Sequence, residues 1–150
     1  MITREEYLMG VARLTAERGT CSRLHVGAVI AANHRIISSG YNGAPAGLAH
    51  CSHPLGEEVV TSCKRAVHAE ANAIAFAARR MSGTEGGEMY VTHQPCIDCA
   101  KLIINSGILS VTWTNPYRLL EGVELLREAG IKLYVMHPMN HQRSPYIPLP

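Results

Sequence analysis

The sequence predicts a layered α/β fold whose sheet contains a parallel portion. In the second half of the chain, short apolar segments typical of strands alternate with segments of helical periodicity. Such alternation implies crossover connections, which place strands side by side in parallel. With 150 residues, 47% of them hydrophobic and 17% charged, the chain can form one domain with its own core.

The first predicted elements are a helix and a hairpin. Residues 3–6 have the pattern of a capping box, and apolar residues follow at helical spacing towards Gly19. Residues 26–32 and 35–39 are short β-branched runs, and the turn between them, Asn33-His34, predicts a hairpin.

An irregular stretch and three further pairs of elements follow. Residues 43–63 are rich in Gly, Pro, Ser, His and Cys, and a loop of this length is usually functional or held by a group such as a metal. Pro95 favours the first turn of a helix, while Gly107 and Gly130 favour helix ends. The predicted helices are 68–80, 95–107 and 119–129, and the predicted strands are 88–92, 109–114 and 131–136.

These elements predict five strands and one domain over residues 1–136. The tail, residues 137–150, contains four prolines, and we expect it to pack irregularly or to reach a neighbouring subunit.

Charge and composition exclude several classes of protein. A net charge of +2 gives no basic stripe, so we expect no nucleic-acid partner, although a few arginines suffice for a small anionic ligand. No apolar run reaches the roughly 18–20 residues of a membrane span, so we expect no membrane partner. The polar start of the chain does not resemble a secretory signal, which predicts a cytoplasmic location where cysteines more often bind metal than form disulfides.

A split motif predicts the chemistry. His68-Ala69-Glu70 precedes one predicted helix, and Pro95-Cys96-Ile97-Asp98-Cys99 begins another. One histidine and two cysteines give zinc three protein ligands and leave a fourth position for water. Glu70 lies close enough to His68 to carry protons to and from that water. The pattern H-x-E…P-C-x-x-C is typical of zinc-dependent nucleobase deaminases.

The alternative is a closed zinc site that only stabilises the fold. Such a site needs a fourth protein ligand, and Glu70 could fill that role. A C-x-x-C pair alone is weak evidence for an enzyme, but the His-x-Glu motif and the proline before Cys96 make the combined pattern specific.

The chain resembles the cytidine deaminase superfamily and, within it, the deoxycytidylate (dCMP) deaminases. The resemblance extends from about Cys21 to Val135, and Ala71 departs from it, where the family usually has a larger apolar residue. It rests on the following segments: His68-Ala69-Glu70-Ala71-Asn72-Ala73-Ile74, Gln94-Pro95-Cys96-Ile97-Asp98-Cys99, Cys21-Ser22-Arg23-Leu24-His25-Val26-Gly27-Ala28-Val29-Ile30, Gly40-Tyr41-Asn42-Gly43-Ala44-Pro45-Ala46-Gly47 and Asn115-Pro116-Tyr117-Arg118.

The resemblance implies a fold, an activity and its regulation. The fold would be a three-layer α-β-α domain with a five-stranded mixed sheet. His68, Cys96 and Cys99 would hold catalytic zinc, with Glu70 as the proton shuttle. The reaction would be hydrolysis of dCMP to dUMP and ammonia, which supplies dUMP for dTTP synthesis. The family is commonly a homohexamer regulated by dCTP and dTTP, so a homo-oligomer and these effectors are expected partners.

The resemblance also implies nucleotide contacts. Asn42 would contact the deoxyribose hydroxyl, and Tyr117 would pack on the base; a turn asparagine and a core aromatic are the structural alternatives. Arg23 and Arg118, with Arg65 as a further candidate, would bind the 5′-phosphate, unless they are surface charges.

A second, structural zinc is common in the family. Cys21, Cys51 and Cys63 are suitably placed for one, with His50 or His53 as a fourth ligand. Three free thiols near one loop fit the same sequence.

Three other functions compete with dCMP deamination. One is a deaminase of another cytosine nucleoside, nucleotide or free base. A second is a tRNA adenosine deaminase, which the near-neutral charge disfavours. A third is a non-catalytic zinc module or a competence accessory protein, against which the intact Glu70 argues.

Overall fold

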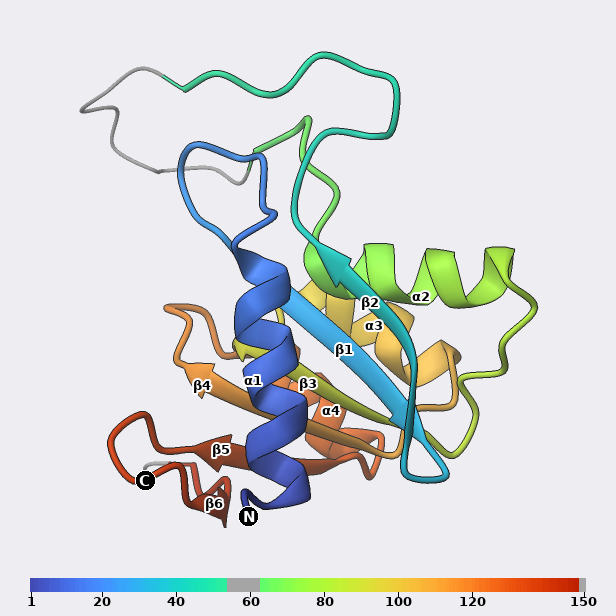
Figure 1. The fold of residues 1–150 in the computed structure, drawn as a ribbon. Helices are drawn as coiled ribbons and strands as arrows, with labels where there is room; N and C mark the ends of the chain where they lie inside the picture. Colours follow the sequence, from blue (N-terminus) through green and yellow to red (C-terminus); the bar gives the residue numbers. More distant parts are fainter. Residues whose placement is uncertain (54–62, 149–150) are drawn as a thin grey trace.

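A mixed β-sheet flanked by helices on both faces forms the frame of the protein (Figure 1). The computed structural model describes residues 1–53 and 63–148. Within these ranges the sheet has six strands in the order β2-β1-β3-β4-β5-β6. The helices are α1 (Arg4–Ala16), α2 (Ala69–Arg79), α3 (Ile97–Asn105) and α4 (Glu121–Glu128), and the strands are β1 (Gly27–Ala32), β2 (Arg35–Tyr41), β3 (Glu88–His93), β4 (Ser110–Asn115), β5 (Lys132–Met136) and β6 (Arg143–Pro145).

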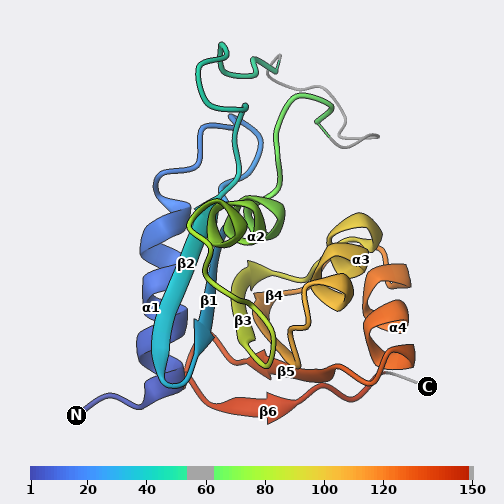
Figure 2. The ribbon, with the colours of Figure 1, turned by 90° about the vertical axis from the view of Figure 1, so that its right-hand side faces the viewer.

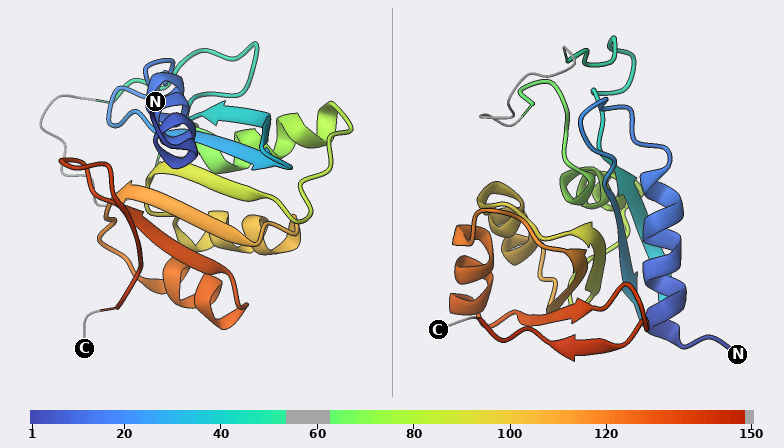
Figure 3. Two further views of the ribbon diagram at one scale, coloured as in Figure 1. Left: turned by 60° about the horizontal axis from the view of Figure 1, so that its bottom comes forward. Right: turned by 90° about the vertical axis from the view of Figure 1, so that its left-hand side faces the viewer.

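The helices divide unequally between the two faces of the sheet. Figure 2 shows α1 on one side and α2, α3 and α4 on the other, and the right-hand view of Figure 3 shows the same three layers from the opposite side. Each face has its own apolar cluster: Met9 and Ala12 of α1 pack with Tyr90, whereas Ala73 and Ile103 pack in the cluster on the opposite face. The predicted three-layer α-β-α architecture is confirmed.

The predicted start of α1 is also confirmed. The hydroxyl of Thr3 accepts a hydrogen bond from the backbone N–H of Glu6, and the Glu6 carboxylate accepts one from the backbone N–H of Thr3. This reciprocal capping box satisfies two N–H groups that the first helical turn would otherwise leave unpaired.

Strand β1 is an uninterrupted apolar run because both of its faces are buried. Val29 and Ala31 face α1, while Ala28 and Ile30 face the helices on the other side. Because β1 lies between β2 and β3 and is covered on both faces, it has no polar side. The turn to β2 has Asn33 and His34 at φ of 49° and 62°, which is the backbone of a tight hairpin and confirms the predicted turn.

Parallel pairing brings the carboxyl ends of β3 and β4 to one edge of the sheet. Strand β3 pairs in parallel with β4, and β4 pairs in parallel with β5. Helix α3 connects the first pair and α4 connects the second, so both lie in crossover connections. The segments after β3 and β4 therefore leave the sheet side by side.

The sheet has one strand more than the sequence predicts. Strand β6, within the tail expected to be irregular, pairs antiparallel with β5. The guanidinium of Arg143 lies 3.6 Å from the ring centroid of Tyr134, and its Nη1 lies 3.8 Å from a carboxylate oxygen of Glu5. These tertiary contacts fix β6, whereas its sequence, Arg-Ser-Pro, has little intrinsic preference for a strand.

None of the helices described within residues 1–53 and 63–148 is long and apolar enough to cross a membrane.

Helix α2 contacts strand β2 backbone to backbone. A Cβ atom added at Gly40 would lie 2.4 Å from the carbonyl oxygen of Ala69 and 2.4 Å from the nitrogen of Ala73. The absence of a side chain at Gly40 thus fixes the position of the first turns of α2, the helix whose N-terminus carries His68.

We expect Gly40→Ala to destabilise the protein by roughly 1–3 kcal/mol, because the new methyl group must displace helix α2. Urea denaturation measures this loss. The matched control is Gly10→Ala on α1, where nothing lies within 4 Å of the added Cβ. That substitution should raise the unfolding free energy by about 0.5–1 kcal/mol through helix propensity. Equal effects of the two substitutions would contradict the backbone contact.

Candidate active site

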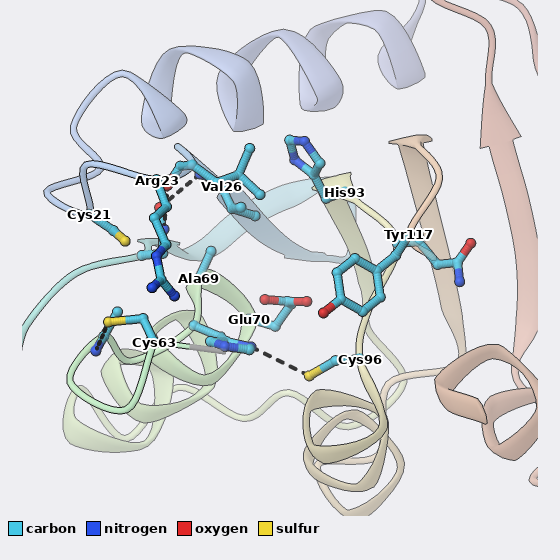
Figure 4. A pocket seen from close by; sticks show the side chains of 14 residues that line it. Cys21, Arg23, Val26, Cys63, Ala69, Glu70, His93, Cys96 and Tyr117 are labelled. Atoms are coloured by element: carbon cyan, nitrogen blue, oxygen red, sulfur yellow. Dashed lines mark hydrogen bonds between the residues drawn. The ribbon is translucent and has the colours of Figure 1, made fainter. Parts of the chain in front are cut away.

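A pocket of about 160 Å³ opens where the parallel strands end (Figure 4). Its wall combines the segment before β1, the residue after β2, the N-termini of α2 and α3, and the segments that follow β3 and β4. Ligands of α/β proteins commonly bind at the carboxyl ends of parallel strands, where the connecting loops separate. The topology thus assembles this pocket from segments distant in sequence.

Two helix N-termini point their first residues at one position in the pocket. His68 is the N-cap of α2, and Cys96 is the N-cap of α3. Neither side chain caps its own helix, so both are available to a common partner. Cys99 lies one turn into α3 and faces the same point, because residues three apart share a helix face.

The distances among these three side chains fit a metal ion. Nδ1 of His68 lies 3.4 Å from Sγ of Cys96 and 3.4 Å from Sγ of Cys99, and all three ligand atoms lie within 4.8 Å of one another. Bond lengths of about 2.0 Å to nitrogen and 2.3 Å to sulfur, in a tetrahedron, separate those atoms by about 3.5 Å. The cluster is therefore compatible with zinc.

The electrostatics of the cluster favour a thiolate. Hydrogen bonds from Cys99 and then from His68 lower the pKa of Cys96 to about 4. The Cys96 thiolate in turn raises the pKa of the His68 imidazole to about 9. Helix N-termini add partial positive charge, which also stabilises thiolate. The site thus has the anionic sulfur that zinc requires as a ligand.

Glu70 is a buried carboxyl group beside this cluster. Its residue is 4% exposed, and burial raises its pKa to about 7. Figure 4 shows Glu70 and Tyr117 directed towards each other, next to the contact between Cys96 and His68. A carboxyl group with this pKa can both accept and release a proton near neutral pH.

The predicted nucleotide contacts are only partly brought together. Arg23, Asn42 and Tyr117 line the pocket, whereas among the described residues Arg118 is an exposed residue outside its wall. Arg65, the further phosphate candidate, is exposed and donates from Nε to the carbonyl oxygen of Ala49 at 2.6 Å.

Asn42 has a structural role that the sequence did not reveal. Its Oδ1 accepts a hydrogen bond from the backbone N–H of Val26 at 2.8 Å, and its Nδ2 donates to the carbonyl oxygen of Leu24 at 2.6 Å. These bonds hold the segment that leads from Arg23 into β1. One acceptor and one donor position of the amide remain for a ligand.

Two further pocket residues, the last residue of β3 and the one after it, were given no role from the sequence. His93 is half-buried, which lowers its pKa and favours the neutral imidazole, and its Nδ1 lies 3.0 Å from Oγ1 of Thr92. Gln94 is buried and donates from Nε2 to the carbonyl oxygen of Leu119 at 3.0 Å. Their position at the carboxyl end of a predicted parallel strand, just before Cys96, was the available sequence signal.

A second cluster of metal-binding side chains borders the pocket. Ligand atoms of Cys21, Cys51, His53 and Cys63 all lie within 4.8 Å of one another. Sγ of Cys21 is 3.7 Å from Nε2 of His53, while Cys21 and Cys63 also line the pocket. Of the two histidines expected as a fourth ligand, the structure brings His53 to the cysteines.

Comparisons with known proteins agree with this geometry. The chain is 41% identical over 131 residues to ComE operon protein 2 of Bacillus subtilis, covering 87% of this chain and 69% of that protein. It is 34% identical over 173 residues to the deoxycytidylate deaminase of Enterobacteria phage T2, covering 89% and 92% of the two chains. The structure is similar to the dCMP deaminase of cyanophage S-TIM5 in complex with dCMP and dUMP, with a TM-score of 0.81, 32% identity and coverage of 88% and 96%.

The chain also matches a protein family as a whole. Residues 2–115 match the cytidine and deoxycytidylate deaminase zinc-binding region. This range contains the three side chains at the ends of α2 and α3 and the buried Glu70 between them. The chain therefore belongs to the family of zinc-binding cytidine and deoxycytidylate deaminases.

Proposed function

We propose that this protein catalyses the hydrolytic deamination of dCMP to dUMP, with release of ammonia. The observation that carries the proposal is the buried carboxyl group of Glu70 beside His68, Cys96 and Cys99 in one pocket. Relatives that bear the name deoxycytidylate deaminase, and the similar cyanophage structure that contains dCMP and dUMP, support this substrate over other cytosine compounds.

His68, Cys96 and Cys99 would hold zinc through one nitrogen and two sulfur atoms. Three protein ligands leave one side of a tetrahedral ion open, and that side would face the pocket. When bound there, zinc supplies the Lewis acidity that activates water at neutral pH.

Glu70 would move the protons of the reaction. Its carboxylate takes a proton from the attacking water as the new oxygen bond to C4 of the cytosine forms. It delivers this proton to the ring nitrogen N3. It then takes the proton of the hydroxyl group now on C4 and passes it to the exocyclic amino group, so that the C4–N bond breaks, the C4 carbonyl forms and ammonia leaves. A pKa of about 7 suits a group that must act first as a base and then as an acid.

The remaining pocket residues would orient the nucleotide. Arg23 would bind the 5′-phosphate, because a guanidinium forms strong charge-assisted hydrogen bonds with phosphate. Tyr117 would pack on the base, and the free donor and acceptor positions of the Asn42 amide would contact the deoxyribose hydroxyl. Arg118, which is exposed beside Tyr117, would be a second contact for the phosphate.

A second zinc ion would be held by Cys21, Cys51, Cys63 and His53. Four ligands make a closed site, which is typical of structural zinc. Such an ion would join the two segments that carry Cys21 and Cys63, because these cysteines belong to the cluster and also line the pocket.

Ammonia release from dCMP, deoxycytidine, CMP, cytidine and dCTP tests the proposed reaction. Each assay is run with and without added dCTP or dTTP, which also tests the regulation and nucleotide effectors that the resemblance implies. Selective turnover of dCMP supports the proposal. Turnover of another cytosine compound in its place contradicts it, and no turnover supports a non-catalytic zinc module.

We expect Glu70→Gln to reduce kcat for dCMP by roughly 10²–10⁴-fold, because an amide cannot carry the proton. Zinc content, measured by atomic emission, and the unfolding midpoint should change little. The control is Glu124→Gln at an exposed position of α4. If Glu70→Gln retained the wild-type kcat, Glu70 would not be the proton carrier.

Arg23→Ala should reduce kcat/KM for dCMP by about 10- to 100-fold, through loss of charge-assisted hydrogen bonds to phosphate. The kcat/KM for deoxycytidine, which has no phosphate, should stay the same. Arg127→Ala on the exposed side of α4 serves as the control. Equal losses for both substrates would assign Arg23 a structural role.

We expect the purified protein to contain two zinc ions per chain. Cys51→Ser should reduce the content to one, with activity partly retained, and Cys96→Ser should also reduce it to one, with activity lost. A wild-type content of one zinc ion per chain would indicate that the second cluster consists of free thiols.

A further inference from the structure

The segment that carries Tyr117 is attached by three hydrogen bonds to the end of β3 and to Gln94, which follows it. The backbone N–H of Gln94 donates to the carbonyl oxygen of Asn115 at 2.9 Å, and Nδ2 of Asn115 donates to the carbonyl oxygen of Thr92 at 2.8 Å. Nε2 of Gln94 donates to the carbonyl oxygen of Leu119 at 3.0 Å. The bonds of Gln94 thus lie on both sides of Tyr117 in the sequence.

Helix α4, which follows the segment that carries Tyr117, contacts the turn formed by residues 94–96. A Cβ atom added at Gly122 would lie 2.5 Å from the carbonyl oxygen of Pro95 and 2.7 Å from the carbonyl carbon of Cys96. No side chain fits between the start of α4 and the residue expected to bind zinc. Residues 115–122 therefore wrap around residues 94–96 with direct backbone contact.

Gln94 is well placed to hold the segment that carries Tyr117. Its residue is 5% exposed, so its amide hydrogen bond to Leu119 is shielded from competing water. The segment between β4 and α4 contains no regular hydrogen-bonded ladder that would hold Tyr117 by itself. The Tyr117 side chain lines both the pocket of about 160 Å³ and a neighbouring pocket of about 370 Å³ whose lining includes Asp98 and Glu121.

We propose that Gln94 is a positioning residue that holds the ring of Tyr117 in the pocket wall by its hydrogen bond to Leu119. The proposal rests on the proposed function, in which Tyr117 packs on the base. In this proposal, the buried side-chain amide of Gln94 sets the distance between residues 94–96, where zinc would bind, and Tyr117 in the pocket wall. Loss of this amide should weaken nucleotide binding while the chemical step continues.

A double-mutant cycle tests this role. Gln94→Ala should raise KM for dCMP about tenfold with kcat changed by less than about threefold, and Tyr117→Ala should raise KM by at least as much. In the Tyr117→Ala background, Gln94→Ala should have no further effect, because residues that act through one another are not additive. The dissociation constant of dUMP, from calorimetric titration, should follow the same pattern at unchanged zinc content. Additive losses would mean that Gln94 contacts the nucleotide directly and would overturn the proposal.

Hydrogen exchange separates this proposal from the assignment of the substrate. Amides of residues 117–120 should exchange faster in Gln94→Ala than in the wild type, whatever nucleotide the protein acts on. Thr84→Ala is the control, because it removes a hydroxyl hydrogen bond of 2.6 Å to the carbonyl oxygen of Ser106 near the other end of β3. Unchanged exchange in Gln94→Ala would overturn the positioning role, whereas an absence of dCMP turnover by the wild type would overturn only the proposed substrate.

Discussion

The close contact between helix α2 and strand β2 is the constraint on which the site depends. Gly40 allows the backbone of α2 to touch the backbone of β2, and this contact fixes the height at which α2 begins above the sheet. Gly122 allows a similar backbone contact between the start of α4 and residues 95–96, where α3 begins. His68 and Cys96 meet because two helices begin at matched positions, which leaves Nδ1 of His68 3.4 Å from Sγ of Cys96.

Local sequence patterns predicted most of the elements and the core of the site. The capping box at Thr3, the hairpin turn at Asn33 and the helix starts near His68 and Cys96 are encoded by a few adjacent residues each, so they can be recognised without the fold. The three ligand residues and Glu70 could be grouped because their spacing is specific.

Contacts between distant segments could not be predicted in this way. Strand β6 pairs with β5 and places Arg143 over the ring of Tyr134, and no local pattern contains these contacts. The choice of His53 over His50 depends on how the loop folds, since both residues lie near the same cysteines in sequence. Asn42 was assigned to the ligand from resemblance, yet its amide also supports the neighbouring loop through Val26 and Leu24.

The positions of the two ligand clusters in the sequence have a consequence for the order of folding. His68 and Cys96 are 28 residues apart, and Cys21 and His53 are 32 residues apart, so each cluster closes a long loop. Loop closure of this length is entropically costly, and it cannot be compensated before the strands of the sheet pair. Cys96 and Cys99, by contrast, are brought together by a single helical turn. In a full-length chain that refolds, this cysteine pair would be the first partner for a metal ion at the site, and the histidine would join it only when α2 has docked on the sheet.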